Sequence, residues 1–273
     1  MSQDEARALI CCAILTVHHE GQRYDMSFGI SKSKAEYARQ VLVKDWGIND
    51  WGTSLTILEN FSKATADNPI ITEIFENVIA KSQYEVVRSI FAPLKQDALL
   101  GLDLRRNFGH LWEAVTNNAN NDIDVFLNYL NGKDEASKMF HNITASLLLN
   151  RINGGIAGYE QAIRTLILYG YSMEELSKID NFCAWDIGRA GYLAKLAVAA
   201  GFIDEATSRQ YMLAAGKLAY TTYLDWRQFL AAYFIGQGIM GGKAKDIGDF
   251  GDTIQYLIKN KKSPYQKFPL KSA

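Results

Sequence analysis

Proline is scarce in this sequence, with 4 residues among 273. Because proline breaks a helix when it lies in the interior, its scarcity permits long helices along most of the chain. Runs of alternating β-branched residues bounded by hairpin turns are also missing, whereas signals for helix starts and stops are frequent. We therefore expect an all-α protein, built as a multi-helix bundle.

Cysteine is rare as well, and the 3 cysteines are Cys11, Cys12 and Cys183. Their number is odd, two of them are adjacent, and no Cys-x-x-Cys pair occurs. A disulfide framework is therefore not expected, and a reducing compartment fits the sequence best. This pattern predicts a cytoplasmic protein.

Long apolar stretches are missing too. The apolar run from Leu9 to Val17 is far too short to cross a bilayer. The acidic residues Asp4 and Glu5 precede it, which does not fit a signal peptide. We interpret the run as part of a buried helix over about residues 4–20, and we expect no contact with a membrane.

Neither sign of charge predominates, since the sequence contains 29 basic and 30 acidic residues and its net charge is −1. A general nucleic-acid binder needs a basic excess, so that class is not expected, although a local basic patch is compatible with these numbers. Gly-x-Ser-x-Gly, Gly-x-x-x-x-Gly-Lys and His-Glu-x-x-His motifs do not occur. We therefore expect neither a cofactor nor a metal site.

Helix signals divide the chain into two lobes and a tail. The N-terminal helical lobe covers residues 1–116 and the C-terminal lobe covers 122–260, with the Asn-rich stretch 117–121 between them. We expect the lobes to form one continuous domain and the tail, 261–273, to be frayed. Ser33 with Glu36, and Ser172 with Glu175, are capping boxes, and Asn49 is positioned to cap another helix. Further helices are expected at about 35–46, 50–63, 69–91, 96–116, 123–130, 134–150 and 159–169.

The clearest helix signals lie in the C-terminal lobe. Asp180 and Asp204 are positioned to cap two helices, Gly201 to end the first of them, and Asp225 with Gln228 to cap a third. The three helices are expected at about 182–200, 205–223 and 226–240. Because the connections are short, neighbouring helices are antiparallel, which predicts a compact three-helix unit.

Trp185, Asp186 and Arg189 form the most informative motif of the sequence. On a helix, residues three and four apart lie on the same face. The guanidinium of Arg189 is therefore positioned both to pair with Asp186 and to stack on the ring of Trp185. One interpretation is a partly buried ion pair that fixes how the three helices dock. The other is a pocket that holds a polar ligand or performs acid/base chemistry. We favour the structural interpretation, because structural ion pairs perturb charges just as active sites do.

A second pattern runs along the helix expected at 226–240. Apolar and polar residues at spacings of three and four form a stripe, which is typical of a core-facing surface: Trp226, Phe229, Leu230, Tyr233 and Gln237. Trp226 and Tyr233 carry polar edges that need partners when buried, and we expect them to face Asp186 or Arg189. Gly236 is small and allows close contact between helices.

Spaced motifs in this chain resemble those of a bacterial domain-of-unknown-function family, DUF1266 (the YbeU/YbeR-like group). The motifs, in order, are Trp46-Gly47-Ile48-Asn49-Asp50, Ala184-Trp185-Asp186-x-x-Arg189, Ala200-Gly201-Phe202-Ile203-Asp204-Glu205-Ala206 and Trp226-x-x-Phe229-x-x-x-Tyr233-x-x-Gly236. The similarity covers roughly residues 5–250. Where the family usually has Gly-Arg after the tyrosine, this chain has Gly236-Gln237. The resemblance implies a bacterial, mostly helical protein, implies no activity, and supports treating Trp185, Asp186 and Arg189 as one unit.

Two functions compete on these observations. The favoured one is a module that binds a protein partner or a small ligand, because nucleophile motifs, metal sets and phosphate loops are missing. The alternative is an enzyme, a hydrolase or transferase, acting at a polar cleft around Asp186 and Arg189, and its test is whether these two side chains meet solvent. The candidate residues for a pocket or structural motif are Trp185, Asp186, Arg189, Trp226, Tyr233 and Gly236.

Overall fold

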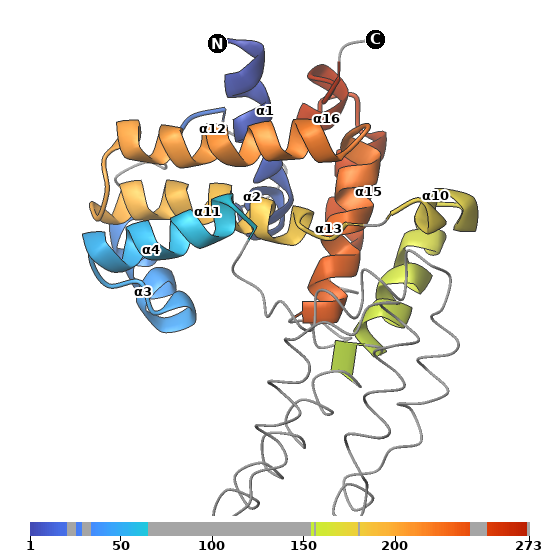
Figure 1. Cartoon of the computed structure of the whole chain (residues 1–273), viewed down its shortest axis with the longest axis horizontal. Coiled ribbons are helices and arrows are strands. Elements are labelled where there is room, and N and C mark those ends of the chain that lie inside the picture. Colours follow the sequence, from blue (N-terminus) through green and yellow to red (C-terminus); the bar gives the residue numbers. More distant parts are fainter. Residues whose placement is uncertain are drawn as a thin grey trace, which may run out of the picture.

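The computed structural model describes residues 1–20, 26–28, 34–64, 154–155, 157–179, 181–240 and 250–271. Over these residues the chain is helical and contains no β-strand, which confirms the prediction of an all-α fold (Figure 1). No helix in this part of the chain combines the length and the apolar character needed to cross a membrane.

Helices occupy both ends of the chain. In chain order they are α1 Gln3–Cys11, α2 Ala13–Glu20, α3 Ala35–Trp46, α4 Trp51–Ser62, a helix at 157–168, α10 Met173–Ser177, α11 Ala184–Ala200, α12 Glu205–Thr222, α13 Trp226–Met240, α15 Gly251–Lys259 and α16 Pro264–Lys267. The helices expected between residues 69 and 150, the boundary at 117–121, and the predicted caps at Ser33 and Asp180 lie outside the described residues.

Two helices replace the single one expected over residues 4–20. The chain turns at Cys12, whose thiol donates a hydrogen bond to the carbonyl oxygen of Leu9 (3.1 Å). This break lets α1 pack mainly on α12, while α2 packs on α11 and α15. The correction has a tertiary cause, since the apolar run continues through Cys12 and carries no helix-breaking residue.

The turn between α3 and α4 follows its sequence signals with one correction. Gly47 ends α3 in the left-handed conformation, at φ 66°, where a residue without a Cβ is favoured. Asp50, and not Asn49, is the N-cap of α4, because its carboxylate accepts a hydrogen bond from the Thr53 amide (2.7 Å). Both asparagine and aspartate are good caps, so local sequence did not separate the two neighbours.

The ends of the C-terminal helices agree with most of their predicted signals. Gly201 ends α11 at φ 77°, and the amide of Phe202 returns to the carbonyl oxygen of Ala197 (2.9 Å), as a Schellman stop requires. Asp204 accepts from the Thr207 amide, and Asp225 accepts from the Gln228 amide, each at 2.7 Å. The capping box of Ser172 with Glu175 is also present at the start of α10.

The start of α11 differs from the prediction. The helix begins at Ala184, two residues later than expected, and its N-cap residue Cys183 makes no side-chain capping bond. Instead, the Ala184 amide donates to the hydroxyl of Tyr223, which follows α12 (2.9 Å). The first backbone amide of α11 is therefore hydrogen-bonded by a side chain that lies 39 residues away in the sequence.

Helix α11 is the centre of the packed core. It contacts α12, α13, α3, α4 and α2, and almost all of its residues are buried. Figure 1 shows α11 and α12 running side by side, with α3 and α4 next to α11. Helices α12 and α13 each pack on α11 and hardly touch one another. One apolar core thus contains residues from both ends of the chain.

Residues 261–271 pack against the core, contrary to the expectation of a frayed tail from residue 261. Ser263 caps the short helix α16, whose first residue is Pro264, and the side chains of Tyr265 and Leu270 are buried. The Arg7 guanidinium donates a hydrogen bond to the Leu270 carbonyl oxygen (2.8 Å), which attaches this segment to α1. The apolar residues that lie between the lysines of residues 261–271 pack on the core and hold this segment against it.

Candidate functional site

The Trp-Asp-x-x-Arg motif forms a buried ion pair in the first turns of α11. The guanidinium of Arg189 bonds to the Asp186 carboxylate, and only 2% of Asp186 and 8% of Arg189 are exposed. The guanidinium carbon lies 4.4 Å from the ring centre of Trp185 and 4.2 Å from that of Phe61. Arg189 therefore joins α11 to α4 through its cation–π contact with Phe61, whereas its ion pair with Asp186 and its contact with Trp185 lie within α11.

This geometry supports the structural interpretation of the motif. A carboxylate that acts in acid/base chemistry must reach its substrate, whereas the Asp186 side chain is enclosed and bound to Arg189. A buried charge is tolerated when a charged partner and hydrogen bonds compensate for lost hydration. The pair meets that condition, and it is in the position where α4 docks on α11.

Tyr233, which belongs to the predicted stripe, and Gly236, which was expected to allow close contact between helices, both join this cluster from α13. The rings of Trp185 and Tyr233 pack edge to face, with centroids 5.0 Å apart. A Cβ added at Gly188 would lie 2.6 Å from the Tyr233 ring, and one added at Gly236 would lie 2.9 Å from the Trp185 Cβ. Glycine at both positions therefore allows α11 and α13 to approach closely.

Some polar atoms within this helix contact are buried without a hydrogen-bond partner. They are the indole nitrogen of Trp185, the hydroxyl oxygen of Tyr233 and the side-chain oxygen of Gln237. Burial raises the pKa of the Tyr233 hydroxyl strongly, and the nearby charge of Arg189 offsets only part of that effect. Tyr233 consequently stays neutral and does not serve as a base at neutral pH.

Trp226 lies apart from the motif, contrary to the expectation that it would face Asp186 or Arg189. Its ring stacks on Tyr265 with centroids 5.0 Å apart, and its indole nitrogen donates to the carbonyl oxygen of Phe268 (2.6 Å). Trp226 begins α13, two turns before Tyr233, and the C-terminal segment covers it. The six candidate residues therefore divide into a cluster of five around the ion pair and a separate tryptophan.

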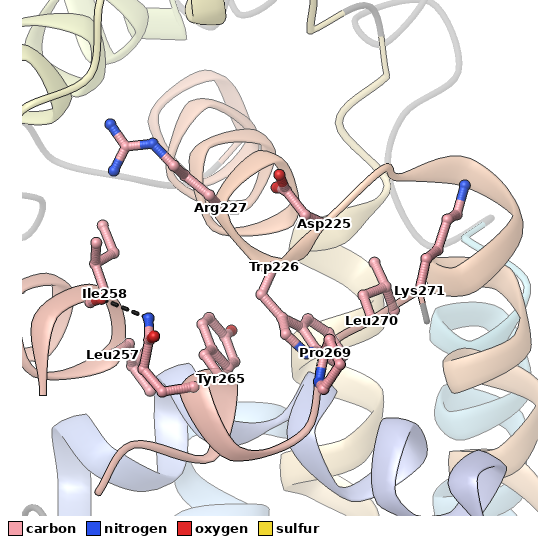
Figure 2. A pocket seen from close by; sticks show the side chains of 10 residues that line it. Asp225, Trp226, Arg227, Leu257, Ile258, Tyr265, Pro269, Leu270 and Lys271 are labelled. Atoms are coloured by element: carbon pink, nitrogen blue, oxygen red, sulfur yellow. Dashed lines mark hydrogen bonds between the residues drawn. The ribbon is translucent and has the colours of Figure 1, made fainter. Parts of the chain in front are cut away.

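An open groove lies beside Trp226, at the start of α13. Its volume is about 220 Å³. The apolar lining consists of Trp226, Leu257, Ile258, Tyr265, Pro269 and Leu270. Figure 2 shows Arg227 and Lys271 at opposite ends of this groove, with Asp225 between them. The groove thus has an aromatic and aliphatic floor and a charged rim.

A second hollow of about 120 Å³ lies on the other side of Arg227, between α10 and α13. Both hollows share Asp225 and Arg227, so they form two halves of one surface. The Arg227 guanidinium donates to Glu175 (2.7 Å) and lies over the ring of Tyr171 (3.9 Å). Hydrogen bonds from Arg227 and from the Ser172 amide lower the pKa of Glu175 to about 2.

Sequence analysis missed the residues that α16 and the following segment contribute to the groove. Tyr265 and Lys271 were placed in a frayed tail, although one local signal pointed to order there. Ser263 followed by Pro264 is a capping residue with proline at the first helical position, a strong start signal for a helix. The burial of Tyr265 against Trp226 results from tertiary packing, so it could not be predicted from the neighbouring residues in the sequence.

His, Cys, Asp and Glu side chains form no group of three or more that would hold a metal ion, within the ranges that the structure covers. Cys11, Cys12 and Cys183 form no disulfide within the part of the chain that the structure describes, and Cys11 and Cys12 are buried. Burial raises the pKa of the Cys11 thiol, so this side chain stays protonated and unreactive.

Comparison with known proteins places the chain in a family. Residues 41–270 match the family model described as "Protein of unknown function (DUF1266)". No curated protein and no solved structure matches the chain. Because the matched region contains most of the chain, including the Trp-Asp-x-x-Arg motif and the groove at the start of α13, the chain belongs to the DUF1266 family.

Proposed function

We propose that this member of the DUF1266 family is an interaction module that binds a segment of another protein in the groove at the start of α13. The observation that supports this function best is the groove itself, which joins an aromatic floor to a charged rim. Interfaces are dominated by a few apolar or aromatic anchors that fill such pockets, surrounded by a polar rim.

The size of the groove favours an anchoring side chain. Its volume of about 220 Å³ is below the roughly 300–1,000 Å³ that is common for pockets of drug-sized ligands. The space corresponds to one large side chain and little more. The second hollow, about 120 Å³, lies beyond Arg227 and provides room for a smaller side chain of the same segment. Two neighbouring hollows suit a short peptide segment better than one compact small molecule.

The enzymatic alternative has less support. A hydrolase or transferase acting at Asp186 and Arg189 needs both groups at a cleft, whereas the two side chains are buried and bound to each other. The open groove contains a tyrosine, Tyr265, whose buried hydroxyl has its pKa raised by desolvation, which makes it a poor base. Binding is therefore the function that these contacts favour.

We also propose that the protein works in a bacterial cytoplasm. The support for this is the cysteine pattern of the sequence, in which three cysteines, two of them adjacent and none in a Cys-x-x-Cys pair, do not suit a disulfide framework. Cytosolic proteins keep their thiols reduced, whereas secreted proteins of modest size commonly pair them.

A groove-filling substitution tests the proposed function. Gln266 lines the groove and is exposed, so Gln266→Trp introduces an indole into the space, with the loss of one exposed hydrogen bond to the Ile258 carbonyl oxygen. Gln255→Trp on the exposed surface of α15 is the matched control, since Gln255 does not line the groove. Peptides selected on the wild-type protein from a randomised display library are the probes, titrated by fluorescence anisotropy.

The expected result is that the selected peptides lose at least about tenfold in affinity for Gln266→Trp, as removal of one interface anchor commonly causes. They should bind Gln255→Trp as tightly as they bind the wild type. Selection without enrichment, or peptides that bind both variants equally, would show that the groove is not the binding site.

A further inference from the structure

The C-terminal part of the chain is basic, although the whole protein is nearly neutral. Between residues 251 and 271 the sequence contains a single acidic residue, Asp252. The same stretch contains lysine at positions 259, 261, 262, 267 and 271. The complete chain, in contrast, has a net charge of −1. The positive charge is therefore concentrated around the end of α15 and around α16, and we call these five lysines the basic patch.

The charges of the basic patch are not compensated within the described part of the protein. Four of its lysines are exposed, and no ion pair is found there for any of the five. Surface lysines elsewhere do have acidic partners, such as Lys63 with Glu59 and Lys178 with Glu174. An uncompensated group of like charges costs folding free energy through repulsion, and an anionic partner would relieve that repulsion.

The basic patch borders the groove directly. Lys259 follows Ile258, Lys267 follows Gln266, and Ile258 and Gln266 both line the groove. The Gln266 amide donates to the Ile258 carbonyl oxygen (2.6 Å), which brings the end of α15 next to α16. Lys271 itself lines the groove, and Figure 2 shows it at the end opposite Arg227.

Among the described residues, the acidic side chains that line or border the groove already have partners. The Asp225 carboxylate lines the groove, but it accepts the Gln228 amide as the cap of α13 (2.7 Å). Glu175 is bound to Arg227, so this pair contributes little net charge to the rim. Asp252 lies at the opposite end of α15 from Lys259. Among the described residues, the five lysines therefore outnumber the acidic side chains on this side of the groove.

We propose that the partner segment bound in the groove is acidic: an aromatic or aliphatic side chain fills the pocket beside Trp226, and flanking carboxylates contact the basic patch. This inference rests on the proposed function, because the pocket supplies the anchor. Charge complementarity around an apolar centre directs encounter and selects the partner, while the anchor provides most of the affinity.

A nucleic acid is the less favoured anionic partner. Nucleic-acid binders commonly have a basic excess over the whole domain, whereas this chain has a net charge of −1. The groove next to the lysines is mostly apolar, which suits a peptide side chain more than a phosphate backbone.

The test compares two synthetic peptides on the full-length protein. The acidic probe has a central tryptophan flanked on both sides by glutamates, and the neutral probe has the same tryptophan flanked by glutamines. Affinities are measured by fluorescence anisotropy while the salt concentration rises from about 50 to about 500 mM, which shortens the range of charge interactions. A single-stranded oligonucleotide of similar length is titrated in parallel.

Two charge variants separate a local effect from a general one. The patch variant changes Lys259, Lys261, Lys262 and Lys267 to Gln. The control variant changes Lys34, Lys44, Lys63 and Lys217 to Gln, which alters the net charge by the same amount at exposed positions on α12 and around α3 and α4. We expect the acidic probe to lose at least about tenfold in affinity for the patch variant, and to change little for the control.

The remaining outcomes are distinguishable. If both probes bind the wild type equally and without salt dependence, the groove binds peptides but the partner is not selected for acidity, and the inference is overturned. If neither probe binds while the library-selected peptides still do, the inference is overturned and the proposed function stands; if the selected peptides also fail to bind, the proposed function itself is contradicted. If the oligonucleotide binds more tightly than the acidic probe and loses affinity for the patch variant, the patch serves nucleic acid and the inference is wrong.

Discussion

The indole nitrogen of Trp226 donates a 2.6 Å hydrogen bond to the backbone carbonyl oxygen of Phe268. This bond joins the first residue of α13 to a segment 42 residues later in the chain. Together with the stacking of Trp226 on Tyr265, it holds the C-terminal segment as one wall of the groove. The stability of the fold and the shape of the groove therefore depend on the same tryptophan.

Replacing Trp226 by Phe should destabilise the protein and weaken peptide binding. The variant keeps an aromatic ring against Tyr265, but it leaves the Phe268 carbonyl oxygen without its donor, which costs about 1–3 kcal/mol. Urea unfolding followed by circular dichroism measures the change. The control is Trp51→Phe, because Trp51 is 62% exposed and should change stability by less than about 0.5 kcal/mol. Equal stability of the two variants would contradict the role of this hydrogen bond.

Replacing Asp186 by Asn should be strongly destabilising. The substitution leaves the buried guanidinium of Arg189 without its counter-charge, and breaking a buried ion pair costs about 3–5 kcal/mol. For a chain of this size, that loss lowers the melting temperature by more than about 5 °C, measured by calorimetry. Glu59→Gln breaks the exposed pair with Lys63 and should have a small effect. An unchanged melting temperature for Asp186→Asn, with loss of a ligand-dependent signal, would favour a functional site.

Replacing Gly236 by Ala should strain the contact between α11 and α13. The added methyl group would lie 2.9 Å from both the Phe182 carbonyl oxygen and the Trp185 Cβ, and backbone atoms there have little freedom to move. Overpacking of this kind costs about 1–3 kcal/mol, measured by chemical unfolding. Gly154→Ala is the matched control, because nothing lies within 4 Å of its added Cβ. A stability gain at both positions would show that the two helices are not in close contact at Gly236.

The ion pair of Glu175 with Arg227 should make stability depend on acid pH. Hydrogen bonds from Arg227 and the Ser172 amide lower the Glu175 pKa from its ordinary value of 4.5 to about 2. Since the pKa is lower in the folded state, the stabilisation is complete above about pH 4.5 and is lost as the pH falls toward about 2. The difference in melting temperature between wild type and Glu175→Gln should therefore shrink over this range.

Glu205→Gln provides the control for the pH experiment. Glu205 is exposed in the first turn of α12, and none of the ion pairs described for this chain includes it. The assigned interaction would be contradicted if the difference in melting temperature between wild type and Glu175→Gln stayed constant from neutral pH to about pH 2.

Capping residues show which parts of the fold were predictable. Gly201, Asp204 and Asp225 act within four residues of their own positions, and their helices end or begin where expected. The start of α11 was placed too early because its terminal amide bonds to Tyr223, a residue from beyond the next helix. Local sequence does not show that such a distant partner exists. The turn at Cys12 was equally unpredictable, because no helix-breaking residue marks it.

The candidate site was predictable in its residues but not in its arrangement. Spacing alone placed Trp185, Asp186 and Arg189 on one helix and allowed their mutual contacts. Whether Asp186 meets solvent depends on which surfaces the other helices cover, and in the packed structure both side chains of the pair are buried. The stripe on α13 likewise predicted that Trp226 and Tyr233 share a helix face, but different segments pack on its two ends.

The all-α class, most described helix boundaries, the family and the ion-paired motif could be predicted from local sequence, because they depend on residues a few positions apart. The enclosure of Asp186 and Arg189, the packing of residues 263–271 on the core, and the groove that Trp226 forms with Tyr265 could not, because they result from contacts between distant segments. Burial and concavity arise from segments distant in sequence, so they follow only once the chain is packed.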